Sequence, residues 1–288
     1  MKIIIGLLVA VACIAGGFAS MGGNLKILFQ PFEYVIIVGG AIGAYIISNP
    51  VSVLKDTVTS FLPGVKKVSR KKADYLELLS LLYLIVRQIQ GQGGIKKLES
   101  DIDNPEESPF FKQFPRLLED KKIIIFICDY LRLVALGTKS PHEVTELMEE
   151  EIETLRHELN ATPRALQTIA DAFPALGIIA AIMGIVKTMG HIDAEPAVLG
   201  MMIGGALVGT ATGIFLCYCV LGPMSTVLQK RRDAEANFYT CVRATLTAYL
   251  QNYPSAVCVE YGRKVISTDV RPSFFDVEEA TSKVRTVS

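Results

Sequence analysis

Charged side chains are scarce in this sequence, and neither sign predominates. Only 20% of the 288 residues are charged, and 29 basic residues balance 29 acidic ones. A nucleic-acid-binding protein needs a clustered basic excess, and a disordered chain needs high charge with few apolar residues. Both classes are excluded, and we expect no nucleic-acid partner.

The residues of enzymatic and metal sites are also few. The six cysteines form no CxxC pair, and the three histidines show no metal-ligand spacing. No glycine-rich phosphate loop accompanies a strand-to-helix pattern, and no nucleophile elbow is present. We therefore expect no enzyme activity, no metal and no cofactor, and we interpret the cysteines as small buried apolar side chains.

Apolar residues, by contrast, make up half of the chain and give a mean hydropathy of +0.38. Four stretches approach the roughly 20 residues that a helix needs to cross a bilayer: 3–19, 34–50, 172–190 and 198–223. Short loops join them in pairs, which predicts an all-α integral membrane protein with four transmembrane helices in two hairpins. The first stretch also fits a cleaved signal peptide, and that alternative stays open.

The basic residues predict the orientation, because positively charged loops stay in the cytoplasm. Of the 29 lysines and arginines, 17 lie in 51–170 and nine follow Pro223, whereas the short loops hold only Lys26. We predict a transmembrane hairpin at 1–50, a large cytoplasmic domain at 51–170, a second hairpin at 171–224 and a cytoplasmic tail at 225–288. Both termini are then cytoplasmic.

The sequence of the cytoplasmic segment predicts a helical domain. Apolar residues recur every three or four positions over 73–90, and the glycines of 91–94 end that pattern. Ser140 to Glu143 has the capping signals that open a second helix to about residue 159, and Asp103 to Glu106 is a further start signal. No strand alternation is sustained.

The four apolar stretches contain no aspartate or glutamate, and Asp171 falls at the cytoplasmic edge of the third. Ion carriers and proton relays need an intramembrane carboxylate or an equivalent polar chain. Either this chain moves no ions, or a partner supplies the acid and this chain supplies the wall around it.

Two threonines and two prolines are candidates for that wall. Thr210 and Thr212 lie in the fourth stretch, where a threonine can also simply bond the carbonyl four residues earlier. Pro174 and Pro223 each remove a backbone hydrogen bond, either to permit a kink or because they lie at helix ends. Glycines spaced four apart permit close helix packing, within the chain or with a partner: Gly39 and Gly43, Gly200 and Gly204, and Gly205, Gly209 and Gly213.

Charged residues surround the glycine break of the cytoplasmic domain. They offer a surface for a charged protein partner or form an ordinary solvated face: Arg87, Lys96, Lys97, Glu99, Asp101 and Asp103.

Several segments resemble the motility protein A (MotA) family, the stator subunits of bacterial flagellar motors. The segments AFPALGIIAAIMGIVKTMG (172–190) and 196–223 are similar to the family's third and fourth membrane helices. Shorter matches are spread over nearly the whole chain: GGNLKILFQPFEYVIIVGGAIGAYI, LESDIDNP, FICDYLRL, MEEEIET, EYGRK and RPSF.

The resemblance implies an inner-membrane, multi-pass subunit that forms a proton channel with MotB and couples ion flow to torque. In this family a MotB dimer carries the essential membrane aspartate, five MotA copies form a ring around the two MotB chains, and the ring acts on the rotor protein FliG. The lipid bilayer is the remaining partner.

The resemblance also assigns roles to single residues. Pro174 and Pro223 match the family's mechanistic prolines, and Thr210 matches the threonine that lines the ion path. Ala181 matches a position that is alanine in proton-driven members, which favours protons as the coupling ion. Glu99 matches the rotor-facing glutamate.

The family's rotor-facing arginine falls at Gly91, so a different basic residue is expected to make its contact: Arg87, Lys96 or Lys97. Two other readings remain. An energiser of outer-membrane processes similar to ExbB and TolQ shares a distant architecture, and a passive membrane scaffold would also lack intramembrane acids.

Overall fold

The computed structural model describes residues 2–61, 70–92, 94–137 and 140–284. These residues are helical or lie in turns, and none of them is in a strand. Within these ranges, four helices are long and apolar enough to cross a membrane. The predicted class, an all-α integral membrane protein, is confirmed.

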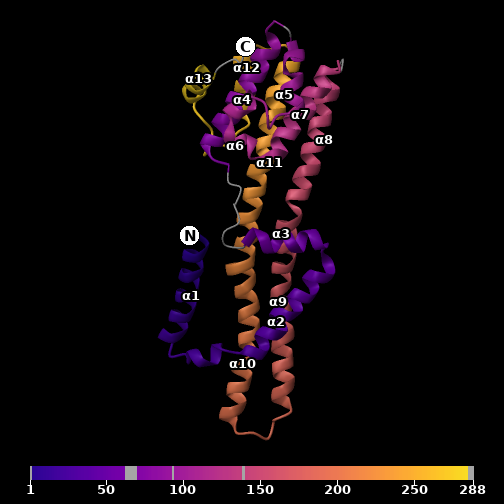
Figure 1. Cartoon of the computed structure of the whole chain (residues 1–288). Helices are drawn as coiled ribbons and strands as arrows, with labels where there is room; N and C mark the ends of the chain where they lie inside the picture. The colour runs from indigo at the N-terminus through magenta and orange to yellow at the C-terminus, as the bar shows by residue number, and fades with distance from the viewer. Residues whose placement is uncertain (1, 62–69, 93, 138–139, 285–288) are drawn as a thin grey trace. The chain divides into compact units, whose positions relative to one another are not determined.

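Packing divides the chain into two compact units (Figure 1). The apolar unit contains 1–67 and 160–230, and the charged unit contains 68–159 and 231–288. Segments 51–61 and 160–170 thus pack with the membrane helices, and 231–284 packs with the charged unit. The boundaries of the four predicted segments mark where the chain would enter and leave a membrane. The division into two units does not test them, so they stay a prediction.

The apolar unit is built from long helices. α9 and α10 lie side by side and are joined by a short loop, and α2 packs against both (Figure 1). The helices of this unit are α1 (Lys2–Ser20), η1 (Leu25–Leu28), α2 (Pro31–Ser48), α3 (Val51–Phe61), α9 (Ala161–Met189), α10 (Pro196–Phe215), η4 (Leu216–Leu221) and the first part of α11 (Gly222–Leu250).

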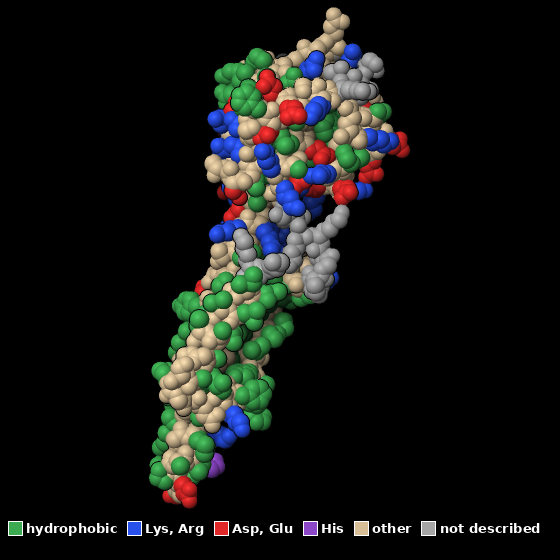
Figure 2. All heavy atoms as spheres, turned by 90° about the vertical axis from the view of Figure 1, so that its left-hand side faces the viewer, with side chains coloured by type: hydrophobic (Ala, Val, Ile, Leu, Met, Phe, Trp, Pro, Cys, Tyr) green, Lys and Arg blue, Asp and Glu red, His purple; other side chains and the backbone are tan. Residues whose placement is uncertain are grey.

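The core of the apolar unit is small, since α2, α9 and η4 meet around five buried side chains: Ile37, Ala41, Phe173, Ala180 and Cys217. Apolar side chains cover most of the face that Figure 2 shows, and charged ones gather at its tip. None of the apolar window of α1 is buried by the rest of the chain. This surface suits hydrocarbon or neighbouring subunits rather than water.

Helix α3 follows the second membrane helix and lies against α9. The hydroxyl of Thr162 donates a hydrogen bond of 2.6 Å to the Asp56 carboxylate, which ties α3 to the start of α9. Ser225 donates a buried hydrogen bond of 2.8 Å to the carbonyl of Pro163, so α11 is tied to the same end of α9. These polar contacts fix one end of the bundle.

The charged unit has a larger apolar core, centred on α4 and packed by shorter helices. Its helices are α4 (Lys72–Gln90), η2 (Gly94–Leu98), α5 (Glu99–Asp103), η3 (Phe111–Gln113), α6 (Pro115–Leu118), α7 (Lys121–Ala135), α8 (Pro141–Leu159), the rest of α11, α12 (Ser255–Lys264) and α13 (Phe274–Ser282). Acidic and basic side chains are interspersed on the face of this unit that Figure 2 shows.

The helices predicted at 73–90 and from 140 to about 159 are confirmed as α4 and α8, and the glycine break ends α4 at Gln90. The start signal expected at Asp103 is wrong. Asp103 is the last residue of α5, and Asn104 ends that helix, because its backbone N–H donates to the carbonyl of Ser100. The sequence Asn104-Pro105 forms a turn instead.

The cysteines mostly follow the expectation. Four are buried, Cys219 is half-buried, and Cys13 is exposed on α1. Burial raises the pKa of the Cys128 thiol to about 12 and that of the Cys258 thiol to about 11. These side chains behave as apolar core groups.

Candidate functional site

Helices α9 and α10 approach so closely that two glycines, Gly177 and Gly213, leave no room for a side chain. A Cβ added at Gly213 would lie 2.5 Å from the carbonyl oxygen of Phe173, and one at Gly177 would lie 2.9 Å from that of Gly209. Backbone atoms cannot move aside as a flexible side chain can. The two helices therefore form one closely packed hairpin.

The glycine pairs of the sequence fall into two groups. Gly205, Gly209 and Gly213 face atoms of the same chain. A Cβ at any glycine of the second group would meet nothing within 4 Å in the described residues: Gly39, Gly43, Gly200 and Gly204. Both uses of close glycine packing are therefore available, one within the chain and one toward a neighbour.

Thr210 and Ala181 lie at this hairpin interface. The Cα of Thr210 is 3.2 Å from the Cβ position of Gly177, and the backbone N of Ala181 is 3.5 Å from that of Gly209. Ala181 is buried, with an exposed fraction of 6%. The structure thus brings these two predicted residues to the same part of the α9–α10 contact.

The threonine hydroxyls differ along these helices. Thr188 donates to the carbonyl of Gly184 at 2.9 Å, in the ordinary back-bonded way. Within the described part of the chain, the hydroxyls of Thr210 and Thr212 make no hydrogen bond. The back-bonded alternative for these two threonines is wrong, and both hydroxyls are free to bind water, an ion or a partner group.

Pro174 lies inside α9, which continues on both sides of it. The alternative that this proline marks a helix start is therefore wrong. Because proline has no N–H, the carbonyl four residues earlier, that of Ala170, loses its helical partner. The next residues lead to Gly177 and the close contact with α10.

Pro223 follows an irregular turn. Residues Leu216–Leu221 form a π-helix, in which the N–H of Gly222 donates to the carbonyl of Cys217. The helix then continues through Pro223 as α11, so this proline also lies within a continuous rod. π segments inside helices occur frequently at functional sites, and this one adjoins one of the two predicted prolines.

A hollow of about 450 Å³ opens beside the π segment and contains Pro223 but not Pro174. It is lined by Gln167, Cys217, Tyr218, Gly222, Pro223, Thr226 and Val227. Gln167 donates a hydrogen bond of 2.8 Å to the Asp171 carboxylate one turn along α9. An acidic and an amide group therefore adjoin the irregular turn.

Glu33 precedes the second predicted membrane helix, 34–50, by one residue. Helix α2 begins at Pro31 rather than near Tyr34, so Glu33 occupies its first turn. Its Oε2 is 3.0 Å from the Cβ position of Gly209. The signal was present in the sequence, because proline is favoured at the first position of a helix. The apolar unit therefore carries an acidic residue at the start of one of its helices.

The predicted partner-facing charges lie in the charged unit and are all exposed: Arg87, Lys96, Lys97 and Glu99. Arg87 is in the last turn of α4, the lysines are in η2, and Glu99 begins α5. Among the described residues, none of the four forms an ion pair. Unpaired exposed charges are free to meet an oppositely charged partner.

Gly91 ends α4 with its N–H donating to the carbonyl of Gln88 at 3.2 Å. Its φ of −81° is open to every amino acid. A Cβ there would lie 3.3 Å from the Gln88 oxygen, which is tight but needs only a small adjustment. The absence of arginine at this position is therefore not imposed by the backbone.

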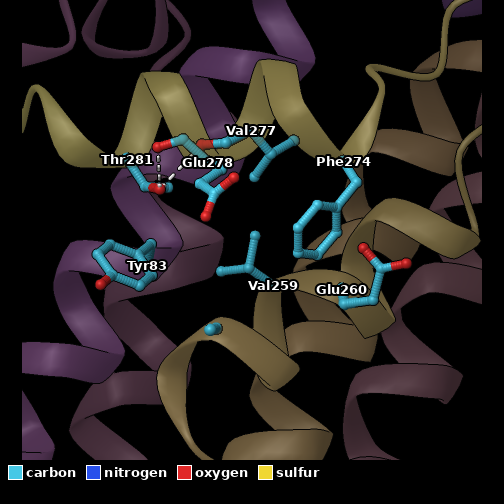
Figure 3. A pocket seen from close by; sticks show the side chains of 8 residues that line it. Tyr83, Val259, Glu260, Phe274, Val277, Glu278 and Thr281 are labelled. Carbon is cyan, nitrogen blue, oxygen red and sulfur yellow. Dashed lines mark hydrogen bonds between the residues drawn. The ribbon is translucent and has the colours of Figure 1, made fainter.

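The charged unit also contains a cavity of about 190 Å³ between α4, α12 and α13. In Figure 3 the side chains of Phe274 and Val277 point from α13 toward Val259 of α12, with Tyr83 and Glu278 beside them. Small-molecule sites usually measure about 300–1,000 Å³. This cavity is below that range, and it contains none of the four predicted partner-facing charges.

Helix α13 is held by an ionised carboxylate. Lys72 lies 2.7 Å from Asp276, whose other contacts are the Ser273 hydroxyl and backbone in a reciprocal cap. The hydrogen bond with Lys72, followed by those with Ser273, lowers the pKa of Asp276 to about 2. The cap therefore depends on this carboxylate staying charged.

Two family models match the sequence. Residues 4–93 match the motility protein A N-terminal model, and residues 119–240 match the MotA/TolQ/ExbB proton channel family. Chemotaxis protein LafT of Vibrio parahaemolyticus is 40% identical over 97% of this chain and 98% of its own length. Motility protein A of Escherichia coli is 39% identical over 99% of this chain and 96% of its own length.

Two solved structures show the same fold. The C. jejuni MotAB structure matches with a TM-score of 0.72 at 20% identity, covering 94% of this chain and 98% of that one. The Bacillus subtilis flagellar MotAB stator complex matches with a TM-score of 0.67 at 21% identity, covering 89% and 92%. With relatives near 40% identity over nearly the full length, the chain belongs to the motility protein A family.

Proposed function

We propose that this chain is the stator subunit of a bacterial flagellar motor, forming with a MotB partner a proton channel that couples ion flow to torque. The observation that carries the proposal is the α9–α10 hairpin: a glycine-packed wall with a free Thr210 hydroxyl and no acidic residue in its segments 172–189 and 196–215. The two relatives described above are named as a chemotaxis protein and a motility protein, which supports the proposal, and neither is named as an enzyme.

The partner supplies the missing acid. In this proposal a MotB dimer contributes the membrane aspartate, and five copies of this chain surround the two MotB helices. The uncovered faces of α1 and of the glycines at 39, 43, 200 and 204 provide surface for such neighbours. No cofactor is needed, because the coupling ion is itself the substrate.

Protons are the proposed ion. Ala181 is buried beside Gly209, so this part of the wall offers a methyl group where a hydroxyl would add a ligand for a metal cation. Sodium and similar hard cations are bound by several oxygens at once. The carbonyls freed by Pro174 and Pro223 lie at other positions along the helices.

The charged unit would meet the rotor. The exposed side chains of Arg87, Lys96, Lys97 and Glu99 carry both signs and would contact the rotor protein FliG. In this proposal the charged unit and both termini lie in the cytoplasm, with the chain in the inner membrane, because loops rich in basic residues stay on the cytoplasmic side.

One charge crossing 100 mV supplies about 2.3 kcal/mol, enough to bias a conformational step of that size. Protonation of the partner's aspartate removes a charge from the path and changes which packing of the helices around it is favoured. Pro174, Pro223 and the π segment are the places where α9 and the α10–α11 rod lack regular hydrogen bonds. They are therefore the places where those helices would bend.

The test is proton flux in liposomes under an applied potential. The chain with its MotB partner is expected to pass protons, and the chain alone to pass none. Thr210→Val, which removes only the hydroxyl, should lower the flux. The matched control is Thr168→Val, because its hydroxyl is bonded to the Arg164 carbonyl at 3.0 Å. Flux from the chain alone, or no flux from the pair, contradicts the proposal.

An energiser similar to ExbB and TolQ is less well supported, because residues 4–93 match the N-terminal model specific to motility protein A. A deletion strain separates the two functions: it should lose swimming and keep outer-membrane uptake. A strain that swims normally but loses uptake would favour the energiser.

A further inference from the structure

A polar cavity lies in the apolar unit where α2, α9 and α10 meet. Its volume is about 230 Å³. Glutamate, lysine, glutamine and threonine line it together with apolar residues: Gln30, Glu33, Gly184, Lys187, Thr188, Met201, Met202 and Gly205. A titratable cluster of this kind is unusual among helices that otherwise present apolar side chains.

The Glu33 carboxylate is seated in space that glycines leave open. Oε2 is 3.0 Å from the Cβ position of Gly209, and Oε1 is 3.7 Å from that of Gly184. Oε2 is buried and makes no hydrogen bond within the described part of the chain. A buried carboxylate oxygen without a partner is costly and points to a ligand that fills the gap.

The segment that covers the cavity is tied down by its own hydrogen bonds. The Gln30 side chain donates to the carbonyl of Ile27 at 3.1 Å, and the hydroxyl of Tyr34 donates to the carbonyl of Leu28. The Gln30 amide nitrogen is 2.8 Å from the Cβ position of Gly205. The cavity is therefore built by the fold and does not depend on a loose loop.

Lys187 of α9 is the other charged group of this site. It lines the same cavity as Glu33. Within the described residues, the two form no ion pair within 4.0 Å. Helix α10 carries no charged residue, and the charges of the adjoining segments are exposed: Lys26 of η1, and His191, Asp193 and Glu195 of the α9–α10 loop.

We propose that Glu33 is a proton-accepting group of this chain, placed on the outer side of the ion path and acting in series with the partner's aspartate. The proposal rests on the proposed function. A metal ion does not fit, because the cavity offers one carboxylate and contains a lysine, whereas hard cations take about six oxygens. A proton needs only the one free carboxylate oxygen.

The transfer is balanced without any further reactant. A hydronium ion in the cavity gives its proton to the Glu33 carboxylate, which leaves a water molecule and a neutral carboxylic acid. The acid later passes the proton to a water on the inner side, toward Thr210, which becomes a hydronium ion, and Glu33 becomes a carboxylate again. Gly209, against which Glu33 lies, is the residue that precedes Thr210 in α10.

The experiment measures proton influx through the complex of this chain with its partner in liposomes, at fixed potential, while the outer pH is varied from about 5 to about 8. Glu33→Gln keeps the size and removes the proton site. Its influx should fall by about tenfold or more near pH 8, where protons are scarce, and by much less near pH 5. Glu33→Asp should retain the wild-type profile.

The matched control is Glu195→Gln, an exposed glutamate outside the cavity, which should leave the profile unchanged. Gel filtration of each complex checks assembly separately. If Glu33→Gln matches the wild type at every pH, or lowers influx by one constant factor, Glu33 is not a proton acceptor and the inference is wrong. Absence of influx in the wild-type complex would instead contradict the proposed function.

Discussion

Single methyl groups decide whether the α9–α10 hairpin closes. Gly213→Ala would place Cβ 2.5 Å from the Phe173 carbonyl oxygen, so the helices would have to separate. Overpacking of this kind typically costs about 1–3 kcal/mol. We expect a lower thermal midpoint for the purified complex and a loss of flux. Gly91→Ala is the control, because its Cβ would lie 3.3 Å from the Gln88 oxygen and needs only a small adjustment, and equal midpoints for both variants would contradict the close contact.

Arg87 is expected to take the place of the family's arginine at Gly91. Arg87→Ala should slow swimming by a few-fold, since exposed charge contacts contribute about 0.2–1 kcal/mol. Adding Gly91→Arg should restore it, because a φ of −81° accepts any side chain. The control is Lys122→Ala, an exposed lysine on α7. If that change slows swimming equally, or if Gly91→Arg restores nothing, Arg87 has no specific role.

At the scale of the element, the π segment and its proline interrupt a helix that would otherwise be regular. Pro174→Ala and Pro223→Ala would each permit one more helical hydrogen bond, worth about 0.5–1.5 kcal/mol. That bond would favour the straight form of the helix, and it would shift the equilibrium between the bent and straight forms by up to about tenfold. We expect complexes that assemble but give slower swimming in motility assays. Normal swimming by both variants would remove the prolines from the mechanism.

Helix α13 should detach in acid. The pKa of Asp276 is about 2 in the folded chain and 3.8 ordinarily, so its stabilising effect is complete above about pH 4 and is lost as the pH falls toward 2. Hydrogen exchange of the α13 amides, corrected for intrinsic rates, should accelerate over that interval. Asp276→Asn should exchange fast throughout. Glu279→Gln, whose ion pair with Lys283 is 70% exposed on both sides, should match the wild type.

Most elements of the fold could be predicted from the sequence, because their signals are local. The apolar runs and the glycine break at Gln90 gave helix positions close to those observed. The errors arose where a local signal competed with packing. Asn104-Pro105 resembles a helix start, but the chain turns there so that Ile102 and Phe110 can enter the core. The π segment has no composition of its own and could not be foreseen.

The candidate site was predictable in part. The resemblance selected Thr210 and Ala181, and the structure brings both to the α9–α10 contact. It could not show that the Thr210 hydroxyl is free, since that depends on side-chain geometry. Glu33 was missed because the second membrane helix was started three residues too late. That small boundary error concealed a carboxylate that packs between two other helices.

At the scale of the whole molecule, the orientation can be tested with single cysteines. In a background with Cys13 and Cys219 replaced by serine, Asp193→Cys should react with a membrane-impermeant maleimide on intact spheroplasts. Glu99→Cys should react only after the membrane is opened. Both positions are exposed in the structure. The opposite pattern would place the charged unit outside the cell.

The remaining cysteines should give little background in that experiment. Cys128 and Cys258 are buried, and burial raises their pKa to about 12 and about 11, so almost no thiolate exists at neutral pH. The parent without added cysteines serves as the blank. Rapid labelling of the blank would mean that the core of the charged unit opens readily.

The π turn contains one residue more than a turn of α-helix, and this surplus residue sets which way the side chains of the following helix face. One residue corresponds to about 100° of rotation about a helix axis. Ser225, which now donates to the Pro163 carbonyl, faces α9 only because that surplus is present. Shortening 216–221 by a single position would swing Ser225 away from Pro163, so this rod tolerates exchange of its side chains far better than a change in its length.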